Sequence, residues 1–111
     1  MNQNLPFEVL RQLRAQGKTL ATAESCTGGL IGKLLTDVPG SSEVYMGGVI
    51  SYTNGVKHRL LGVSEDTLRV YTAVSRQTAH EMARGMLEIL VGENSRFLED
   101  VSENYYVREA F

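Results

Sequence analysis

The segment from Thr22 to Ile31 places the strongest constraint on the fold of this chain, because a short apolar run ends there in hydroxyl and glycine residues and a helical pattern begins. A strand that leads into a glycine-rich helix start is typical of α/β layers. The first backbone N–H groups of such a helix lack intrahelical partners, so they favour an anion or a developing oxyanion. Ser25 lies immediately before this start and is therefore the first candidate nucleophile.

Apolar residues at helical spacing alternate with short apolar runs along most of the chain. Helices are predicted to begin near the polar residues Asn4, Thr27, Asn54 and Ser75, with a further helical turn over residues 64–68. Strands are predicted over residues 18–23 and 44–52, the second with a bulge or close backbone approach at Gly47-Gly48. We therefore expect an α/β fold with helices packed on a small, at least partly parallel sheet.

The last twenty or so residues carry weaker signals. Phe97, Leu98 and Val101 are compatible with a short helix, and residues 105–107 with a terminal strand. A chain of 111 residues is long enough for one hydrophobic core and too short for two. A single domain over residues 1–111 is therefore expected.

Charge and cysteine content exclude several classes of protein. Eleven Lys and Arg residues against thirteen Asp and Glu residues give a net charge of −2, which disfavours binding to nucleic acid. Cys26 is the single cysteine and cannot form an intrachain disulfide, and no signal peptide or membrane-spanning run is recognisable. These observations predict a cytoplasmic protein that does not associate with membranes.

A serine needs a base to act as a nucleophile, and neither histidine, His58 or His80, lies in a pattern that links it to Ser25. A lysine can serve instead if burial lowers its pKa. Tyr52 ends the second predicted strand and Lys57 begins the next helix. Because the carboxyl ends of parallel strands share one edge, we expect Tyr52 to meet Ser25 there.

Each of these residues also has a structural interpretation. A tyrosine at a strand end usually spans core and solvent, and a lysine in a helix is usually solvated. Cys26 is expected to be a small buried hydrophobe. For Glu24 two interpretations are open, orientation of Lys57 or a partly exposed strand-end carboxylate, and the second is favoured. His58 and His80 are expected to be surface residues without metal-ligand spacing. Met82 and Met86 are expected to be core residues.

Five ordered motifs closely resemble the CinA C-terminal domain family, which includes nicotinamide-nucleotide amidases. The resemblance extends over about residues 7–90 and is far more specific than a lone glycine motif. The motifs are AESCTGGL at residues 23–30, VPGSS at 38–42, GVISYTN at 48–54 followed by Lys57, LLGV at 60–63 and AVS at 73–75.

The resemblance implies hydrolysis of the carboxamide of nicotinamide mononucleotide to nicotinate mononucleotide and ammonia, as in pyridine-nucleotide salvage, with no metal or organic cofactor. It implies Ser25 as nucleophile, Lys57 as general base, and Tyr52 as a relay or an orienting donor. Backbone N–H groups of Cys26, Thr27 and Gly28 would stabilise the oxyanion, and Gly28 and Gly29 would let the substrate approach. The hydroxyl of Thr27 is expected only to cap its helix.

The resemblance ends after the long helix. Family members run to roughly one and a half times this length within a single domain and continue with a central strand and a second Thr-Gly loop. Residues 91–111 show neither, and no glycine follows Glu93. An apparently shortened sheet exposes edges, so a homo-oligomer is expected, with residues 105–107 as the pairing segment. The alternative is a non-catalytic member with a nucleotide-binding or assembly role.

Overall fold

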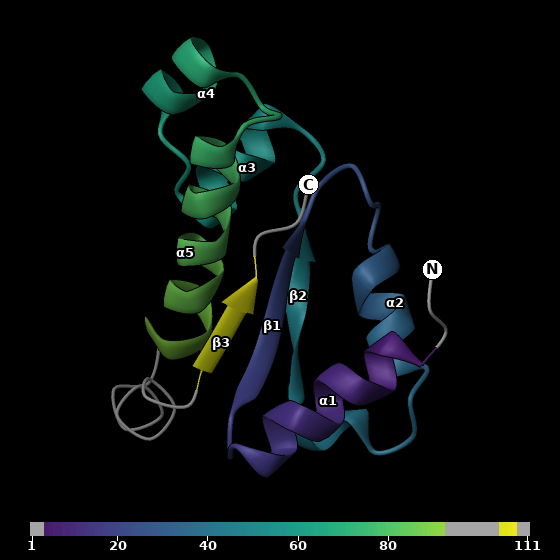
Figure 1. Ribbon diagram of the computed structural model, residues 1–111. Helices are drawn as coiled ribbons and strands as arrows, with labels where there is room; N and C mark the ends of the chain where they lie inside the picture. The colour runs from purple at the N-terminus through teal and green to yellow at the C-terminus, as the bar shows by residue number, and fades with distance from the viewer. Residues whose placement is uncertain (1–3, 93–104, 109–111) are drawn as a thin grey trace.

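The computed structural model describes residues 4–92 and 105–108 (Figure 1). The expected helix over residues 97–101 lies outside this part of the chain. None of the helices within the described residues is long and apolar enough to cross a membrane. The elements in chain order are α1 (Leu5–Ala15), β1 (Thr19–Glu24), α2 (Leu30–Thr36), the 3-10 turn η1 (Ser41–Glu43), β2 (Tyr45–Ile50), α3 (Asn54–Leu61), α4 (Glu65–Tyr71), α5 (Arg76–Gly92) and β3 (Tyr105–Arg108).

The three described strands form a parallel sheet in the order β2-β1-β3, which confirms the expected α/β class. β1 lies in the centre and is buried along nearly its whole length. The expected terminal strand forms at Tyr105–Arg108 and pairs with β1 of the same chain, with Thr19 opposite Tyr105. The segment predicted to pair is therefore used within the chain.

Alternate residues of β1 face two different helical layers. Ala21 and Ala23 pack against Met82 and Met86 of α5, which confirms the two methionines as core residues. On the opposite face, Leu20 packs with apolar side chains of α1 and α2. The sheet is thus covered by α5 on one side, with α3 and α4 packed against α5, and by α1 and α2 on the other (Figure 1).

The predicted irregularity in β2 is confirmed and has a steric cause. The register with β1 skips Met46, since Leu20 lies opposite Tyr45 and Ala21 opposite Gly47. A Cβ atom at Gly48 would lie 2.6 Å from the carbonyl oxygen of Thr22, so only glycine permits this approach of the two strands.

Two predicted helix starts are wrong by a short distance. α2 begins at Leu30 instead of near Thr27, because Gly28 and Gly29 adopt left-handed backbone angles that a helix excludes. α3 is capped by Thr53 instead of Asn54, since Thr53 Oγ1 accepts a hydrogen bond from the N–H of Val56. The cap of α5 is confirmed, because Ser75 Oγ accepts from the N–H of Thr78.

The loop between α4 and α5 contains a strained residue. Thr72 has φ 70° and ψ 173°, a backbone conformation that residues other than glycine rarely adopt. Replacing Thr72 with glycine is expected to raise the free energy of unfolding by about 1 kcal/mol, because relief of strain exceeds the entropy added to the unfolded chain. Thermal unfolding measures this change. Thr72→Ala keeps the strain, so an equal gain in that variant would contradict the explanation.

Candidate active site

Ser25 and Lys57 lie together at the carboxyl end of the sheet, as the family resemblance implies for a nucleophile and its base. Ser25 directly follows β1, and Lys57 lies on α3, which follows β2. Lys57 Nζ lies 2.8 Å from Ser25 Oγ. Lys57 is only 1% exposed, so its amine is enclosed in the protein and is not the solvated lysine usual in helices.

The Lys57 amine is surrounded by backbone carbonyl oxygens and by Ser25. Nζ lies 2.7 Å from the carbonyl oxygen of Ser51 and 3.4 Å from that of Tyr52. No carboxylate among the described residues forms an ion pair with it. Burial lowers the pKa of Lys57 below its ordinary value of 10.5, and Cys26 opposes this effect. A neutral amine can donate to the two carbonyls and direct its lone pair at the Ser25 hydroxyl.

Ser51 is a site residue that the sequence analysis did not single out. Its side chain is fully buried, and its N–H and hydroxyl donate to the carbonyl oxygen of Glu24 at 2.7 and 3.3 Å. Its own carbonyl accepts from Lys57 Nζ. Ser51 therefore links the end of β1 to the lysine, and only the parallel pairing of β1 and β2 reveals this role.

Both interpretations of Glu24 are wrong. It is 3% exposed, so it is not a partly exposed strand-end carboxylate. Its carboxylate does not contact Lys57 either, because the alternation along β1 directs the side chain toward α2. Its carboxylate accepts from the N–H groups of Ile31 and Gly32 at 2.8 and 3.1 Å. The helix start that was expected to attract an external anion is thus occupied by a carboxylate of the chain itself.

The predicted oxyanion donors divide into two groups. The N–H of Gly28 donates to the carbonyl oxygen of Ser25 at 3.0 Å, so this donor is already engaged in the turn. The N–H groups of Cys26 and Thr27 make no hydrogen bond to any other described residue. Cys26 and Thr27 are therefore the two N–H groups left to bind a substrate oxygen.

Thr27 has another role than the predicted helix cap, and Gly29 has a steric role in addition to the predicted one. The hydroxyl of Thr27 donates to Glu24 Oε1 at 2.9 Å and does not cap α2. Gly29 has φ 100°, and a Cβ atom there would lie 2.7 Å from Ile50 Cδ1. The close approach at Gly29 therefore involves a side chain of this protein.

Tyr52 and Cys26 are both exposed. Tyr52 is 74% exposed, and its hydroxyl has no hydrogen-bond partner among the described residues. The side chain of Tyr52 therefore makes no hydrogen bond to Ser25, contrary to the expected meeting, and the Ser25–Lys57 contact forms without it. Cys26 is a free, exposed thiol, which corrects the expectation of a small buried hydrophobe, because it belongs to the turn after β1 and not to the strand.

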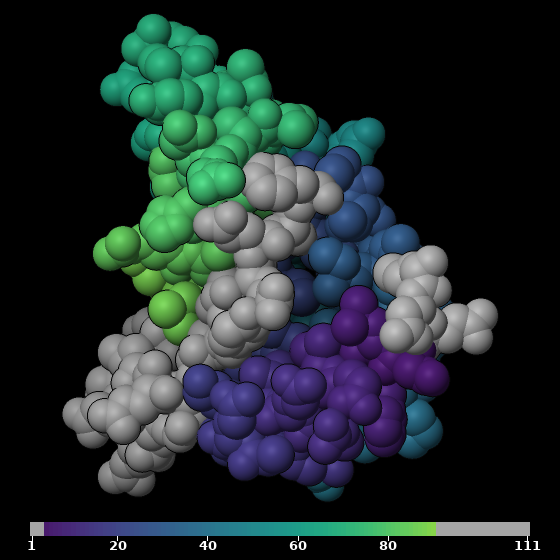
Figure 2. All heavy atoms as spheres, in the orientation of Figure 1, coloured from purple at the N-terminus to yellow at the C-terminus, as the bar shows by residue number. Residues whose placement is uncertain are grey.

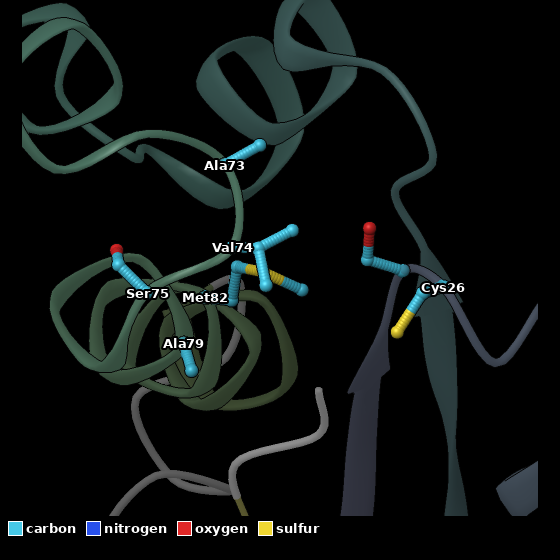
Figure 3. Close-up of a pocket in the computed structure, with 7 residues that line it drawn as sticks. Cys26, Ala73, Val74, Ser75, Ala79 and Met82 are labelled. Carbon is cyan, nitrogen blue, oxygen red and sulfur yellow. The ribbon is translucent and has the colours of Figure 1, made fainter.

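A small pocket lies beside Ser25, between the end of β1 and the start of α5. Val74 and Met82 project toward the end of β1, where Cys26 lies (Figure 3). The pocket has a volume of about 20 Å³, which is room for one water molecule. It is lined by Ser25, Cys26, Ala73, Val74, Ser75, Ala79 and Met82.

The histidines lie outside this arrangement. Both are exposed, as predicted, and His58 Nδ1 pairs with the carbonyl oxygen of Val63 at 2.8 Å. Within residues 4–92 and 105–108 no group of three or more His, Cys, Asp or Glu side chains is placed to hold a metal ion.

Comparison with known proteins agrees with the motifs around this site. Residues 2–94 match the family described as CinA C-terminal domain. This chain belongs to that family. Its relatives include CinA-like proteins of Thermotoga neapolitana and Leptospira interrogans, which are 52% identical over 81 residues and 58% identical over 85 residues. These alignments cover 73% and 76% of this chain.

Solved structures of CinA proteins show the same fold. The competence/damage inducible protein CihA from Agrobacterium tumefaciens superposes with a TM-score of 0.75 at 45% identity, over 78% of this chain. A CinA superfamily protein from Escherichia coli gives a TM-score of 0.76 at 37% identity, again over 78% of this chain. The matched regions amount to 53% and 51% of these two structures, and to 20% of each of the two CinA-like proteins.

Proposed function

We propose that this CinA-family chain hydrolyses a primary carboxamide, that of nicotinamide mononucleotide, with Ser25 as nucleophile and Lys57 as general base. The observation that carries the proposal is the 2.8 Å contact between Lys57 Nζ and Ser25 Oγ, made by a buried amine that no described carboxylate neutralises. A nucleophile within hydrogen-bond reach of a base of lowered pKa is the arrangement that covalent catalysis needs.

The reaction proceeds in two halves. Ser25 Oγ attacks the amide carbon while its proton passes to the neutral amine of Lys57, and the carbonyl oxygen becomes an oxyanion. Lys57 then returns the proton to the leaving nitrogen, which departs as ammonia and leaves an ester on Ser25. A water molecule deprotonated by Lys57 hydrolyses this ester, giving nicotinate mononucleotide and free Ser25.

The turn after β1 supplies the groups that the oxyanion needs. The N–H groups of Cys26 and Thr27 stabilise the oxyanion, because the N–H of Gly28 already donates a hydrogen bond to the carbonyl oxygen of Ser25. Tyr52 lies shortly after β2 with its ring exposed, so we assign it to binding of the substrate and not to a proton relay. No step requires a cofactor.

Ammonia release from nicotinamide mononucleotide tests the proposal. Ser25→Ala is expected to lower the rate at least about 1000-fold, because the covalent step is lost. Ser42→Ala is the matched control, since Ser42 is exposed and lies in η1, outside the candidate site. Activity that survives in Ser25→Ala at the level of Ser42→Ala would refute the assignment.

A non-catalytic role in nucleotide binding or assembly is the second candidate. The pocket beside Ser25 holds only one water-sized group, far less than a nucleotide occupies. An apolar groove of about 310 Å³ also lies between α1 and α2, lined by Leu5, Val9, Ile31 and Leu34 among others. Figure 2 shows this side of the molecule, with α1 in purple beside α2 in blue. Nucleotide binding without ammonia release would favour this candidate.

A further inference from the structure

Glu24 carries a buried carboxylate for which the proposed reaction has no use. It is 3% exposed and forms no ion pair with a described basic residue. A buried carboxylate is costly unless hydrogen bonds satisfy it. Glu24 accepts four, from the N–H groups of Ile31 and Gly32 and from the hydroxyls of Thr27 and Thr22. The carboxylate is therefore well satisfied, and its partners indicate what it holds in place.

The partners of the Glu24 side chain enclose the nucleophile turn. Ile31 and Gly32 belong to the first turn of α2, and Thr27 belongs to the turn between Ser25 and α2. The carboxylate thus joins the turn that follows Ser25 to the start of α2, next to the N–H groups of Cys26 and Thr27, which have no partner among the described residues. A Cβ atom at Gly32 would lie 3.2 Å from Glu24 Oε2, so α2 lies close against the carboxylate.

The backbone of Glu24 holds the base. Its carbonyl oxygen accepts from the N–H of Ser51 at 2.7 Å, and the carbonyl oxygen of Ser51 accepts from Lys57 Nζ at 2.7 Å. Lys57 Nζ in turn contacts Ser25, which follows Glu24 in the chain. These contacts close a ring through Glu24, Ser51, Lys57 and Ser25, with the Glu24 side chain anchoring the ring to α2.

We infer that Glu24 is a positioning residue, whose carboxylate anchors the turn after β1 so that Ser25 Oγ stays within reach of Lys57 Nζ. This inference rests on the Ser25–Lys57 pair of the proposed function. Glu24 does not touch the reacting atoms, because the alternation of β1 places its side chain on the α2 face and Ser25 on the α5 face. Loss of its carboxylate is expected to slow the reaction of Ser25 without moving the pH at which Lys57 activates it.

The probe is phenylmethanesulfonyl fluoride, which sulfonylates an activated serine with loss of fluoride and needs no amide substrate. The rate of sulfonylation of Ser25 is followed by intact mass and expressed per folded protein, with the folded fraction taken from circular dichroism. Glu24→Gln replaces one acceptor oxygen with an NH₂ group and is expected to slow sulfonylation at least about tenfold, because small displacements of a nucleophile are costly. The pH midpoint of the rate is expected to stay unchanged.

Glu81→Gln is the matched control. Glu81 also binds a backbone N–H and a threonine hydroxyl at a helix start, those of Ser64 and Thr67, but it lies outside the ring. This variant is expected to lower the unfolding temperature without changing the sulfonylation rate. Two substitutions of Thr27 give a smaller change at the same contact. Thr27→Val removes one hydrogen bond to Glu24 and is expected to slow sulfonylation about threefold, whereas Thr27→Ser keeps the hydroxyl and is expected to react at the wild-type rate.

The outcomes separate the two proposals. If Lys57→Met slows sulfonylation but Glu24→Gln and Thr27→Val react as fast as the wild type, the positioning role of Glu24 is overturned and the Ser25–Lys57 pair stands. If wild type and Lys57→Met react equally, the pair is not activated and both proposals fail. A shift of the pH midpoint in Glu24→Gln would show an electrostatic effect on Lys57 and would also overturn the positioning role.

Discussion

Lys57→Met is expected to lower ammonia release from nicotinamide mononucleotide about 1000-fold and to leave the unfolding temperature unchanged or higher. Loss of a general base typically lowers the rate by two to four powers of ten. The stability should not fall, because methionine fills similar space without the cost of burying an amine. The lost hydrogen bond to the Ser51 carbonyl offsets only part of this gain. Activity and thermal unfolding measured on one preparation test both effects.

Lys33→Met is the control for this experiment. Lys33 lies on α2 with an exposed side chain that pairs with Asp37, so its replacement is expected to change neither activity nor stability by much. A Lys57→Met variant that loses activity and unfolds at a much lower temperature would contradict the account. That result would indicate that Lys57 is a structural residue.

Gly85→Ala is expected to destabilise the protein by about 3 kcal/mol or more. A Cβ atom at Gly85 would lie 1.8 Å from the carbonyl oxygen of Leu61 and 2.8 Å from its Cα. These are backbone atoms at the end of α3, so the overlap can be relieved only by moving α5 away from α3. The gain in helix propensity from glycine to alanine is about 1 kcal/mol, which is too small to compensate.

Gly55→Ala provides the matched control within α3. A Cβ atom at Gly55 would meet only the flexible end of Arg59, at 3.1 Å from its Nη2 atom. This change is expected to be neutral or slightly stabilising. Chemical denaturation of the two variants measures the difference. Equal stability of Gly85→Ala and Gly55→Ala would show that α5 does not pack against α3 as closely as described.

The closeness of the segments that follow β1 and β2 could be predicted from the sequence because it follows from topology, whereas the pairing of Ser25 with Lys57 is implied by the family resemblance. Parallel strands bring their carboxyl ends to one edge, so the segments that follow two neighbouring strands lie close together there. The loop decides which side chain makes the contact: topology alone predicts Tyr52 beside Ser25, but the side chain of Tyr52 is exposed. The bulge near Gly47 and Gly48 could also be predicted, because paired glycines in a strand indicate close backbone approach. The burial of the two methionines of α5 could be predicted from their helical spacing.

The role of Glu24 could not be predicted because it depends on which face of β1 its side chain occupies. The pattern of small residues in β1 does not distinguish the two faces of the strand. A glutamate at the end of a strand is usually exposed, so exposure is the natural prediction for Glu24. The later start of α2 could not be predicted either, because the left-handed angles of Gly28 and Gly29 delay the helix to Leu30. Backbone angles of this kind become visible only in the structure.

Burial of Lys57 determines how stability depends on pH and, under the proposed function, how activity depends on pH. Its pKa is lowered in the folded protein, so between that value and 10.5 the unfolded chain binds more protons than the folded one. The contribution of Lys57 to stability therefore rises with pH across this interval and is constant below it. Over the lower part of the same interval the amine becomes neutral and able to accept the proton of Ser25.

The rate of ammonia release from nicotinamide mononucleotide as a function of pH tests the central claim most directly. The account predicts that kcat/KM rises with pH through a single ionisation whose midpoint lies below the 10.5 of an ordinary lysine. The residual activity of Lys57→Met should not show this rise. A midpoint at or above 10.5 in the wild type, or the same rise in Lys57→Met, would contradict the assignment of Lys57 as the base that activates Ser25.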